Sequence, residues 1–213
     1  MRTIAFDVTS EDGFKAVARR FGRALALFEA EARKPIRYAG KDLYHAFLIA
    51  IEGPPAAGKS SFIEFAALAY AEEKKREGYT LLTPLKKLWP DAEKQRDVKV
   101  WMRWQFVDAD GGHFEIRSDD QKAVDNLYYE HRDVALPMLE TPHIRFREWP
   151  DDDFLESARA AISIGYQDGR RLLKISIDPA LEVDRIMEIL QEASTAPCLN
   201  LSTSTANEPA PAC

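Results

Sequence analysis

The chain has 213 residues, of which 46% are hydrophobic, and a formal net charge of −6 at pH 7. This length and apolar content suffice for one sizeable core, and the negative charge argues against strong autonomous binding to nucleic acid, because affinity for a phosphate backbone comes from clustered Lys and Arg. The two cysteines, Cys198 and Cys213, lack metal-ligand spacing and indicate neither a zinc site nor a disulfide framework.

Residues 2–8 are expected to form an edge strand, and Ser10 is a candidate N-cap for the helix that follows. The apolar residues of that helix share one stripe, which predicts core packing: Phe14, Val17, Ala18, Phe21, Leu25 and Phe28. The basic groups 19–23 and 74–76 are expected on solvated helix faces. We find neither an N-terminal apolar signal segment nor an apolar run of about 20 residues, so we expect no membrane residence and a cytoplasmic protein.

The strongest motif lies directly after the apolar run 46–51, which is expected to be a strand buried on both faces. Residues 53–60 read Gly-Pro-Pro-Ala-Ala-Gly-Lys-Ser, a complete G-x-x-x-x-G-K-[ST] phosphate-binding loop, and residues 61–77 have helical apolar spacing before a stop at Gly78. We therefore expect a nucleoside triphosphate and Mg²⁺ as ligands. The expected nucleotide-binding residues are Gly53, Ala56, Ala57, Gly58, Lys59, Ser60 and Ser61.

Within this loop, Lys59 is expected to place its charge between the β- and γ-phosphates, and Ser60 to offer a hydroxyl ligand to Mg²⁺. Phosphoryl transfer also needs a carboxylate near the metal. The candidates are Glu115 and Glu148, each at the end of a short strand-like segment, and the alternative for both is an ordinary exposed acid. His113 is a candidate base, or a structural residue at a strand start.

Residues 98–107 predict a strand, and the turn 108–112 returns the chain into 113–117 as a hairpin. Ser118 then is a candidate N-cap for a helix leading into residues 124–128. In the segment 144–150, Arg145 and Arg147 alternate with apolar residues, so Arg147 either reaches the nucleotide or a partner, or lies on a solvated surface.

Residues 161–166 and 169–175 predict a second hairpin. Asp178 and Pro179 form a candidate N-cap and first turn for a last helix. Beyond residue 196 the sequence is rich in Pro, Ser, Thr and Ala without periodicity, which predicts a single domain over 1–196 and a disordered tail over 197–213.

In the order and spacing of these motifs the chain resembles the TsaE (YjeE) family, P-loop ATPases of bacterial tRNA threonylcarbamoyladenosine (t6A) biosynthesis. Residues 113–117, His-Phe-Glu-Ile-Arg, are similar to the family's His-Phe-Asp-Leu-Tyr-Arg, and residues 148–150 match its Glu-Trp-Pro. Gly169 and Arg170 look like the Gly-Arg signature of its closing hairpin. The family's Ser-Pro-Thr switch has only Thr83-Pro84 as a counterpart, so residues 79–97 look like a divergent insertion.

The resemblance implies an α/β, three-layer P-loop NTPase fold with a mixed central sheet. It implies that Lys59 and Glu148 are catalytic, that Ser60 and Glu148 bind metal, that Glu115 takes the place of the catalytic Asp, and that Trp149 lies beside the nucleotide. The implied function is Mg²⁺-dependent ATP hydrolysis, weak without partners, that supports modification of adenosine 37 together with other t6A-synthesis proteins of the TsaB and TsaD type. Contact with tRNA is expected only through those partners.

Two other functions remain open on the sequence. The loop with Ile51-Glu52 before it also looks like that of deoxynucleoside kinases, which makes a small-molecule kinase an alternative. The change from Asp to Glu at position 115 and the missing switch make a non-hydrolysing, nucleotide-responsive binding subunit a second alternative.

Overall fold

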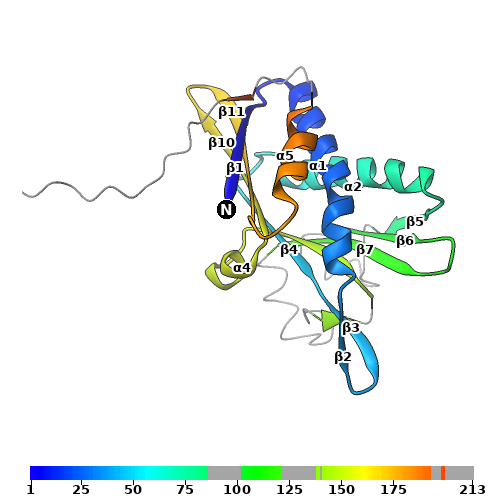
Figure 1. Cartoon of the computed structure of the whole chain (residues 1–213). Coiled ribbons are helices and arrows are strands. Elements are labelled where there is room, and N and C mark those ends of the chain that lie inside the picture. The colour runs from blue at the N-terminus through cyan, green and yellow to red at the C-terminus, as the bar shows by residue number, and fades with distance from the viewer. Residues whose placement is uncertain (86–101, 121–137, 140, 193–197, 200–213) are drawn as a thin grey trace, which may run out of the picture.

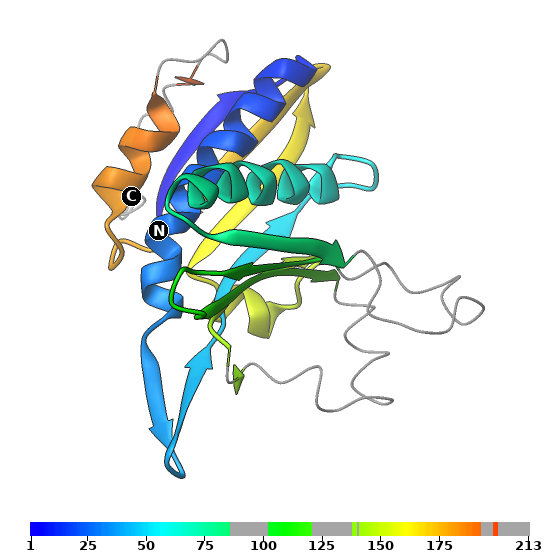
Figure 2. The same cartoon turned by 90° about the vertical axis from the view of Figure 1, so that its right-hand side faces the viewer.

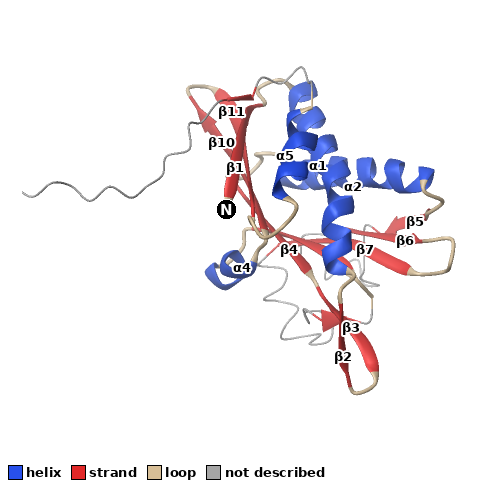
Figure 3. Ribbon diagram, in the orientation of Figure 1, coloured by secondary structure: helices blue, strands red, loops and turns tan. Residues whose placement is uncertain are grey.

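The structure, a computed structural model, describes residues 1–85, 102–120, 138–139, 141–192 and 198–199 (Figure 1). Figure 3 shows the helices gathered beside one large sheet, with a small hairpin projecting from it. The elements are β1 (Arg2–Asp7), α1 (Glu11–Ala32), β2 (Pro35–Tyr38), β3 (Lys41–His45), β4 (Phe47–Glu52), α2 (Lys59–Arg76), β5 (Thr80–Leu85), β6 (Met102–Val107), β7 (His113–Asp120), β8 (Met138–Leu139), β9 (His143–Glu148), α4 (Asp152–Ser157), β10 (Ala160–Gln167), β11 (Arg170–Ile177), α5 (Val183–Gln191) and β12 (Cys198–Leu199).

The large sheet is mixed and has nine strands in the order β12-β1-β11-β10-β4-β9-β7-β6-β5. Its four central strands, β10, β4, β9 and β7, are parallel to their neighbours within this group, and the outer pairs are antiparallel. This arrangement confirms the predicted α/β fold with a mixed central sheet. The strand β4 lies at its centre, as its apolar sequence predicts, because a central parallel strand is buried on both faces.

The two faces of the sheet are covered by different helices (Figures 1 and 2). Ile49 and Ile51 of β4 belong to the main core, which contains the apolar residues of α1, α2 and α5. Ala50 points to the opposite face, because side chains alternate along a strand, and it packs with Phe154 of α4. The described elements therefore form three layers, and none of the described helices is both long and apolar enough to cross a lipid bilayer.

Most of the locally determined features agree with the sequence. Ser10 caps α1, since its hydroxyl accepts a hydrogen bond from the Gly13 N–H at 3.0 Å. The apolar stripe of α1 is fully buried. The hairpin of β6 and β7 turns at Asp108, whose carboxylate accepts from the N–H groups of Asp110 and Gly112.

Four local predictions are wrong. Ser118 does not cap a helix, because β7 continues to Asp120 in pairing with β9; residues 124–128, into which the expected helix leads, lie outside the described part. Asp178 does not begin α5: its carboxylate accepts from the Ala180 N–H in a turn, and the helix starts at Val183. Arg20 and Lys74 are buried rather than solvated.

Two described segments lie within the predicted tail and insertion, and the domain bounds stay predictions. Cys198 and Leu199, in the expected tail, pair with β1 as β12; residues 200–213 lie outside the described part. Residues 80–85, within the expected insertion, form the edge strand β5 against β6. The hairpin of β2 and β3 was not anticipated, and it projects from the lower end of the molecule in Figure 1.

Candidate functional site

The candidate site is the loop that joins β4 to α2, at the carboxyl end of the parallel strands. Gly53 has φ +145° and lies so close to β10 that an added Cβ would be 2.4 Å from the Ile164 carbonyl oxygen. Gly58, with φ +94°, caps α2, and Lys59 is its first residue. Both positions require glycine for a backbone reason. The predicted sequence of buried strand, glycine loop and helix N-terminus is therefore present, and such a terminus favours an anion.

The Lys59 ammonium lies across this loop. It donates hydrogen bonds to the carbonyl oxygens of Gly53 and Pro54, both at 2.9 Å. It also lies 3.7 Å from the centroid of the Trp149 ring, in a cation–π contact. Lys59 is only 4% exposed, so its charge is held at the loop rather than in bulk solvent.

Ser60 and Glu148 meet beside the loop although 88 positions separate them. The Ser60 hydroxyl donates to Glu148 Oε1 at 2.6 Å, and Glu148 is 5% exposed. The contact arises because β9 runs parallel to β4, which sets Glu148 opposite Ile51 at the carboxyl end of both strands. Trp149 follows with φ +58°, and its N–H donates to the Ile51 carbonyl at 3.3 Å.

Hydroxyl and carboxylate oxygens are the donor chemistry that Mg²⁺ prefers. The Ser60 and Glu148 pair therefore fits a magnesium ion that completes its shell with phosphate oxygens and water. Among the described residues no cluster of three or more His, Cys, Asp or Glu side chains is placed to hold a metal ion.

Glu115, the predicted catalytic acid, is not brought to the loop. It lies near the start of β7, opposite His143, whereas Glu148 is opposite Asp120 five positions further along. At roughly 3.3 Å per residue, Glu115 is about 16 Å along the strand from the end that carries the loop. Its carboxylate, in a residue 2% exposed, instead accepts from Gln105 at 2.9 Å and from Arg117 at 2.6 Å. The expectation of a hydrolytic role for Glu115 is corrected by this placement.

His113 is the first residue of β7, at the same end of the strand as Glu115, and it is exposed. The buried imidazole is that of His143, whose Nδ1 lies 3.1 Å from the Thr141 carbonyl oxygen. Burial, and next the charge of Arg117, lower the pKa of His143 to about 4. His143 is therefore neutral at pH 7, and neither histidine reaches the loop.

Sequence reasoning missed a charge cluster on the face of β7 and β9 opposite α1. The Asp119 carboxylate, 3% exposed, accepts from Arg145 Nε at 2.7 Å and from Arg147 Nε at 2.9 Å. The Arg147 guanidinium also lies over the Phe154 ring at 4.5 Å. Both predictions for Arg147, a ligand contact or a solvated position, are replaced by this buried pairing. The sequence signal was a charged residue at every second position of both strands: Glu115, Arg117 and Asp119 on β7, and Arg145 and Arg147 on β9.

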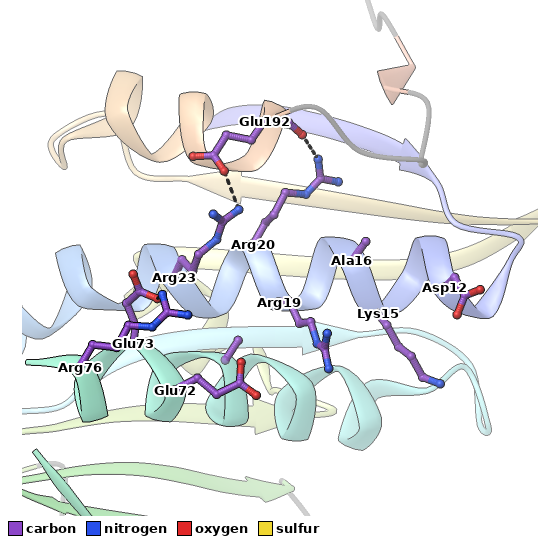
Figure 4. Close-up of a pocket in the computed structure, with 11 residues that line it drawn as sticks. Asp12, Lys15, Ala16, Arg19, Arg20, Arg23, Glu72, Glu73, Arg76 and Glu192 are labelled. Atoms are coloured by element: carbon purple, nitrogen blue, oxygen red, sulfur yellow. Dashed lines mark hydrogen bonds and ion pairs between the residues drawn. The ribbon is translucent and has the colours of Figure 1, made fainter.

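A groove of about 770 Å³ lies away from the loop, between α1, α2 and the end of α5 (Figure 4). Charged side chains of both signs line it, and several of them are paired with each other. Arg23 contacts Glu192 at 2.6 Å, Arg20 donates to the Glu192 carbonyl at 2.6 Å, and Arg76 contacts Glu73 at 3.0 Å. Neither the loop nor Glu148 contributes to this groove.

No protein-family model matches the chain, and no curated protein matches it. The structure is similar to a crystal structure of YdiB from Bacillus subtilis, with a TM-score of 0.45 and 14% sequence identity over 89% of this chain and 94% of that chain.

Proposed function

We propose that this protein binds a magnesium nucleoside triphosphate at residues 53–61 and hydrolyses ATP slowly on its own. The observation that carries the proposal is the 2.6 Å contact of Ser60 with Glu148 beside a glycine loop that opens onto a helix. A buried carboxylate next to the hydroxyl of the loop is the pair of groups that phosphoryl transfer requires near its metal.

The residues of the site have distinct roles in this proposal. The N–H groups at the start of α2 bind phosphate oxygens, and Lys59 exchanges the carbonyls of Gly53 and Pro54 for the phosphate charge. Ser60 and Glu148 would hold Mg²⁺ through the oxygens of their hydroxyl and carboxylate groups. When bound, Mg²⁺ neutralises charge on the phosphates. The Trp149 indole lies against the ammonium that contacts the nucleotide.

We further propose that hydrolysis supports tRNA t6A modification together with partner proteins of the TsaB and TsaD type. This part depends on the resemblance of the sequence motifs at residues 53–60, 113–117 and 148–150 to the TsaE family. The slow reaction proposed for the isolated chain fits a site that a partner completes, since Glu115 does not reach the loop. Recovery of the other t6A-synthesis proteins with a tagged chain is the test, and their absence under native expression would contradict this assignment.

The position of Glu115 also favours a second candidate, a nucleotide-responsive binding subunit without hydrolysis. The two candidates share the binding site and differ in the reaction. Steady ATP hydrolysis that disappears in Glu148→Gln excludes the second candidate.

The first prediction concerns nucleotide binding by purified protein, measured by calorimetry with Mg²⁺ or with EDTA. Lys59→Ala removes a charged hydrogen-bond donor, so we expect affinity for ATP to fall about 10- to 100-fold. Glu148→Gln is expected to remove the Mg²⁺-dependent part of the affinity and to lower hydrolysis about 100-fold. Asp153→Asn, a change of an exposed acid in the first turn of α4, is the control and is expected to behave as wild type.

Two results would contradict the proposal. If the wild-type protein binds no nucleotide when the nucleotide is at millimolar concentration, the proposed function is wrong. ATP-dependent phosphorylation of a nucleoside would replace hydrolysis with the kinase reaction.

A further inference from the structure

Arg171 lies on the strand β11, far from the loop in the sequence but beside it in the structure. Its guanidinium carbon is 3.5 Å from the centroid of the Phe14 ring, near the start of α1. Its Nη2 is 3.8 Å from the position that a Cβ on Gly58 would occupy. The side chain is therefore fixed against an aromatic face next to the N-terminus of α2.

The backbone of Arg171 is also held in place. Its N–H donates to the Thr9 hydroxyl at 3.1 Å, and its carbonyl accepts from the Val8 N–H at 2.8 Å. These bonds join β11 to the segment between β1 and α1, so the guanidinium is oriented before any ligand arrives. Pre-orientation lowers the entropy that binding costs.

The half-buried Arg171 side chain places buried nitrogen donors next to the start of α2. Within the described part of the chain, its Nε and Nη2 are buried without a hydrogen-bond partner, and no carboxylate lies within ion-pair distance. Arg147 on β9, in contrast, is paired with Asp119, and the neighbouring Arg170 lies 3.6 Å from Asp7. Buried donors without partners are costly, and an anionic ligand that accepts their hydrogen bonds removes that cost.

Sheet order indicates which part of a nucleotide Arg171 would meet. The strands beside the loop lie in the order β11-β10-β4-β9, so Arg171 and Glu148 are on opposite sides of β4. Ser60 and Glu148 lie in contact on one side, which in the proposed function is the side of the metal and of the β- and γ-phosphates. The opposite side is left for the α-phosphate and the nucleoside.

We propose that Arg171 binds the nucleotide at its nucleoside end, through an α-phosphate oxygen, which ADP and ATP share. This inference rests on the proposed function, because it assumes that the nucleotide occupies residues 53–61. It makes Arg171 a binding residue for both nucleotides rather than a residue that senses the γ-phosphate.

The experiment is calorimetric titration of the full chain with ADP and with a non-hydrolysable ATP analogue, each with Mg²⁺. Arg171→Met keeps the apolar stem on Phe14 and removes the donors. We expect it to weaken both nucleotides by the same factor, about 10- to 100-fold. Arg170→Met is the matched control, because that neighbouring arginine is exposed and pairs with Asp7, and it is expected to leave both affinities unchanged.

The outcomes separate this inference from the proposed function. Unchanged affinities in Arg171→Met overturn it, and so does a loss for the ATP analogue alone, which would place the guanidinium at the γ-phosphate. Wild-type protein that binds neither nucleotide overturns both proposals, whereas wild-type binding with unchanged Arg171→Met overturns only this one. If Arg171→Met does not fold, as judged by its thermal unfolding, Arg171→Lys retains the charge without the planar donors and is expected to weaken both nucleotides equally.

Discussion

At the scale of single residues, Glu29 is a buried group with several hydrogen-bond donors around its carboxylate. It lies on α1, is 4% exposed, and accepts from the Tyr70 hydroxyl at 2.7 Å and from Arg33 Nε at 2.7 Å. Lys74 of α2 lies 2.8 Å from it. Burial raises the pKa of Glu29, but the hydrogen bonds from Lys74, Tyr70 and Arg33 outweigh burial, and the net pKa is below the ordinary value. The ionised carboxylate therefore links α1 to α2.

We expect Glu29→Gln to lower the free energy of unfolding by about 3 kcal/mol, because Lys74, with its side chain 9% exposed, loses a buried charge partner. The measurement is urea unfolding at pH 7. The loss should shrink at acidic pH: a carboxylate with a lowered pKa stabilises the fold above its unfolded pKa, and that contribution disappears as the pH falls through its folded pKa.

Glu73→Gln is the matched control for this prediction. Its partner Arg76 lies 3.0 Å away, but the two side chains are 38% and 76% exposed. Solvent screens such a pair, so the expected change is below about 1 kcal/mol. Equal effects of the two substitutions would contradict a special role for Glu29.

At the scale of elements, the position of the loop depends on the packing of α1 against α2. The two helices meet at Gly22, where an added Cβ would lie 2.3 Å from the Ala66 carbonyl oxygen and 2.9 Å from the Ala69 Cβ. The nearest of these atoms belongs to the backbone of α2, which cannot rotate away. Because α2 begins at Lys59, a shift of this helix moves the binding residues with it.

Gly22→Ala is expected to destabilise the protein by about 2 kcal/mol, since overpacking outweighs the gain of about 1 kcal/mol in helix propensity. Denaturant unfolding measures the loss, and nucleotide titration should show weaker binding as α2 moves. Gly165→Ala on β10 is the control, because no atom lies within 4 Å of its added Cβ; we expect a change below about 1 kcal/mol. If Gly22→Ala were more stable than the wild-type protein, α1 and α2 would be able to move apart without loss of stability.

At the scale of the whole molecule, the sheet has an apolar face under α1 and α2 and a charged stretch on the opposite face of β7 and β9. His143 begins β9 beside this stretch, near Arg117, Arg145 and Glu115. The pKa of about 4 keeps His143 neutral in the folded protein at a pH where the imidazole of an unfolded chain, with its ordinary pKa of 6.5, takes up a proton. Lowering the pH from about 6.5 to 4 therefore stabilises the unfolded state relative to the folded state.

We expect this single group to remove about 3 kcal/mol from the free energy of unfolding over that pH range. Urea unfolding at a series of pH values should show the decline in wild-type protein, and His143→Gln should show a smaller slope between pH 6.5 and 4. The slope is compared rather than the absolute stability, because the substitution also changes packing. His113→Gln, which replaces an exposed imidazole, is the control, and an equal change of slope in both variants would contradict the assignment to His143.

Features that depend on neighbouring residues were predictable from the sequence. The loop at 53–60 needs glycine at two backbone positions, the Ser10 cap needs a hydroxyl three residues before Gly13, and the turn at Asp108 needs a carboxylate beside glycines. Each of these is a short-range steric or hydrogen-bonding requirement, so its signature lies within a few residues. The order of strands and helices around the loop follows from similar patterns.

The tertiary structure alone decided which distant groups meet. Glu115 and Glu148 are equivalent in sequence, as acids near strand ends, but parallel pairing with β4 carries Glu148 to the loop and sets Glu115 at the other end of the sheet. Arg147 and Arg171 both have strand positions, and only the packing shows that Asp119 binds the first while the second faces Phe14 and Gly58. The sequence by itself determined a glycine loop with the phosphate-binding motif on an α/β sheet. Strand direction and register, which depend on contacts between residues far apart in the chain, determined which side chains surround it.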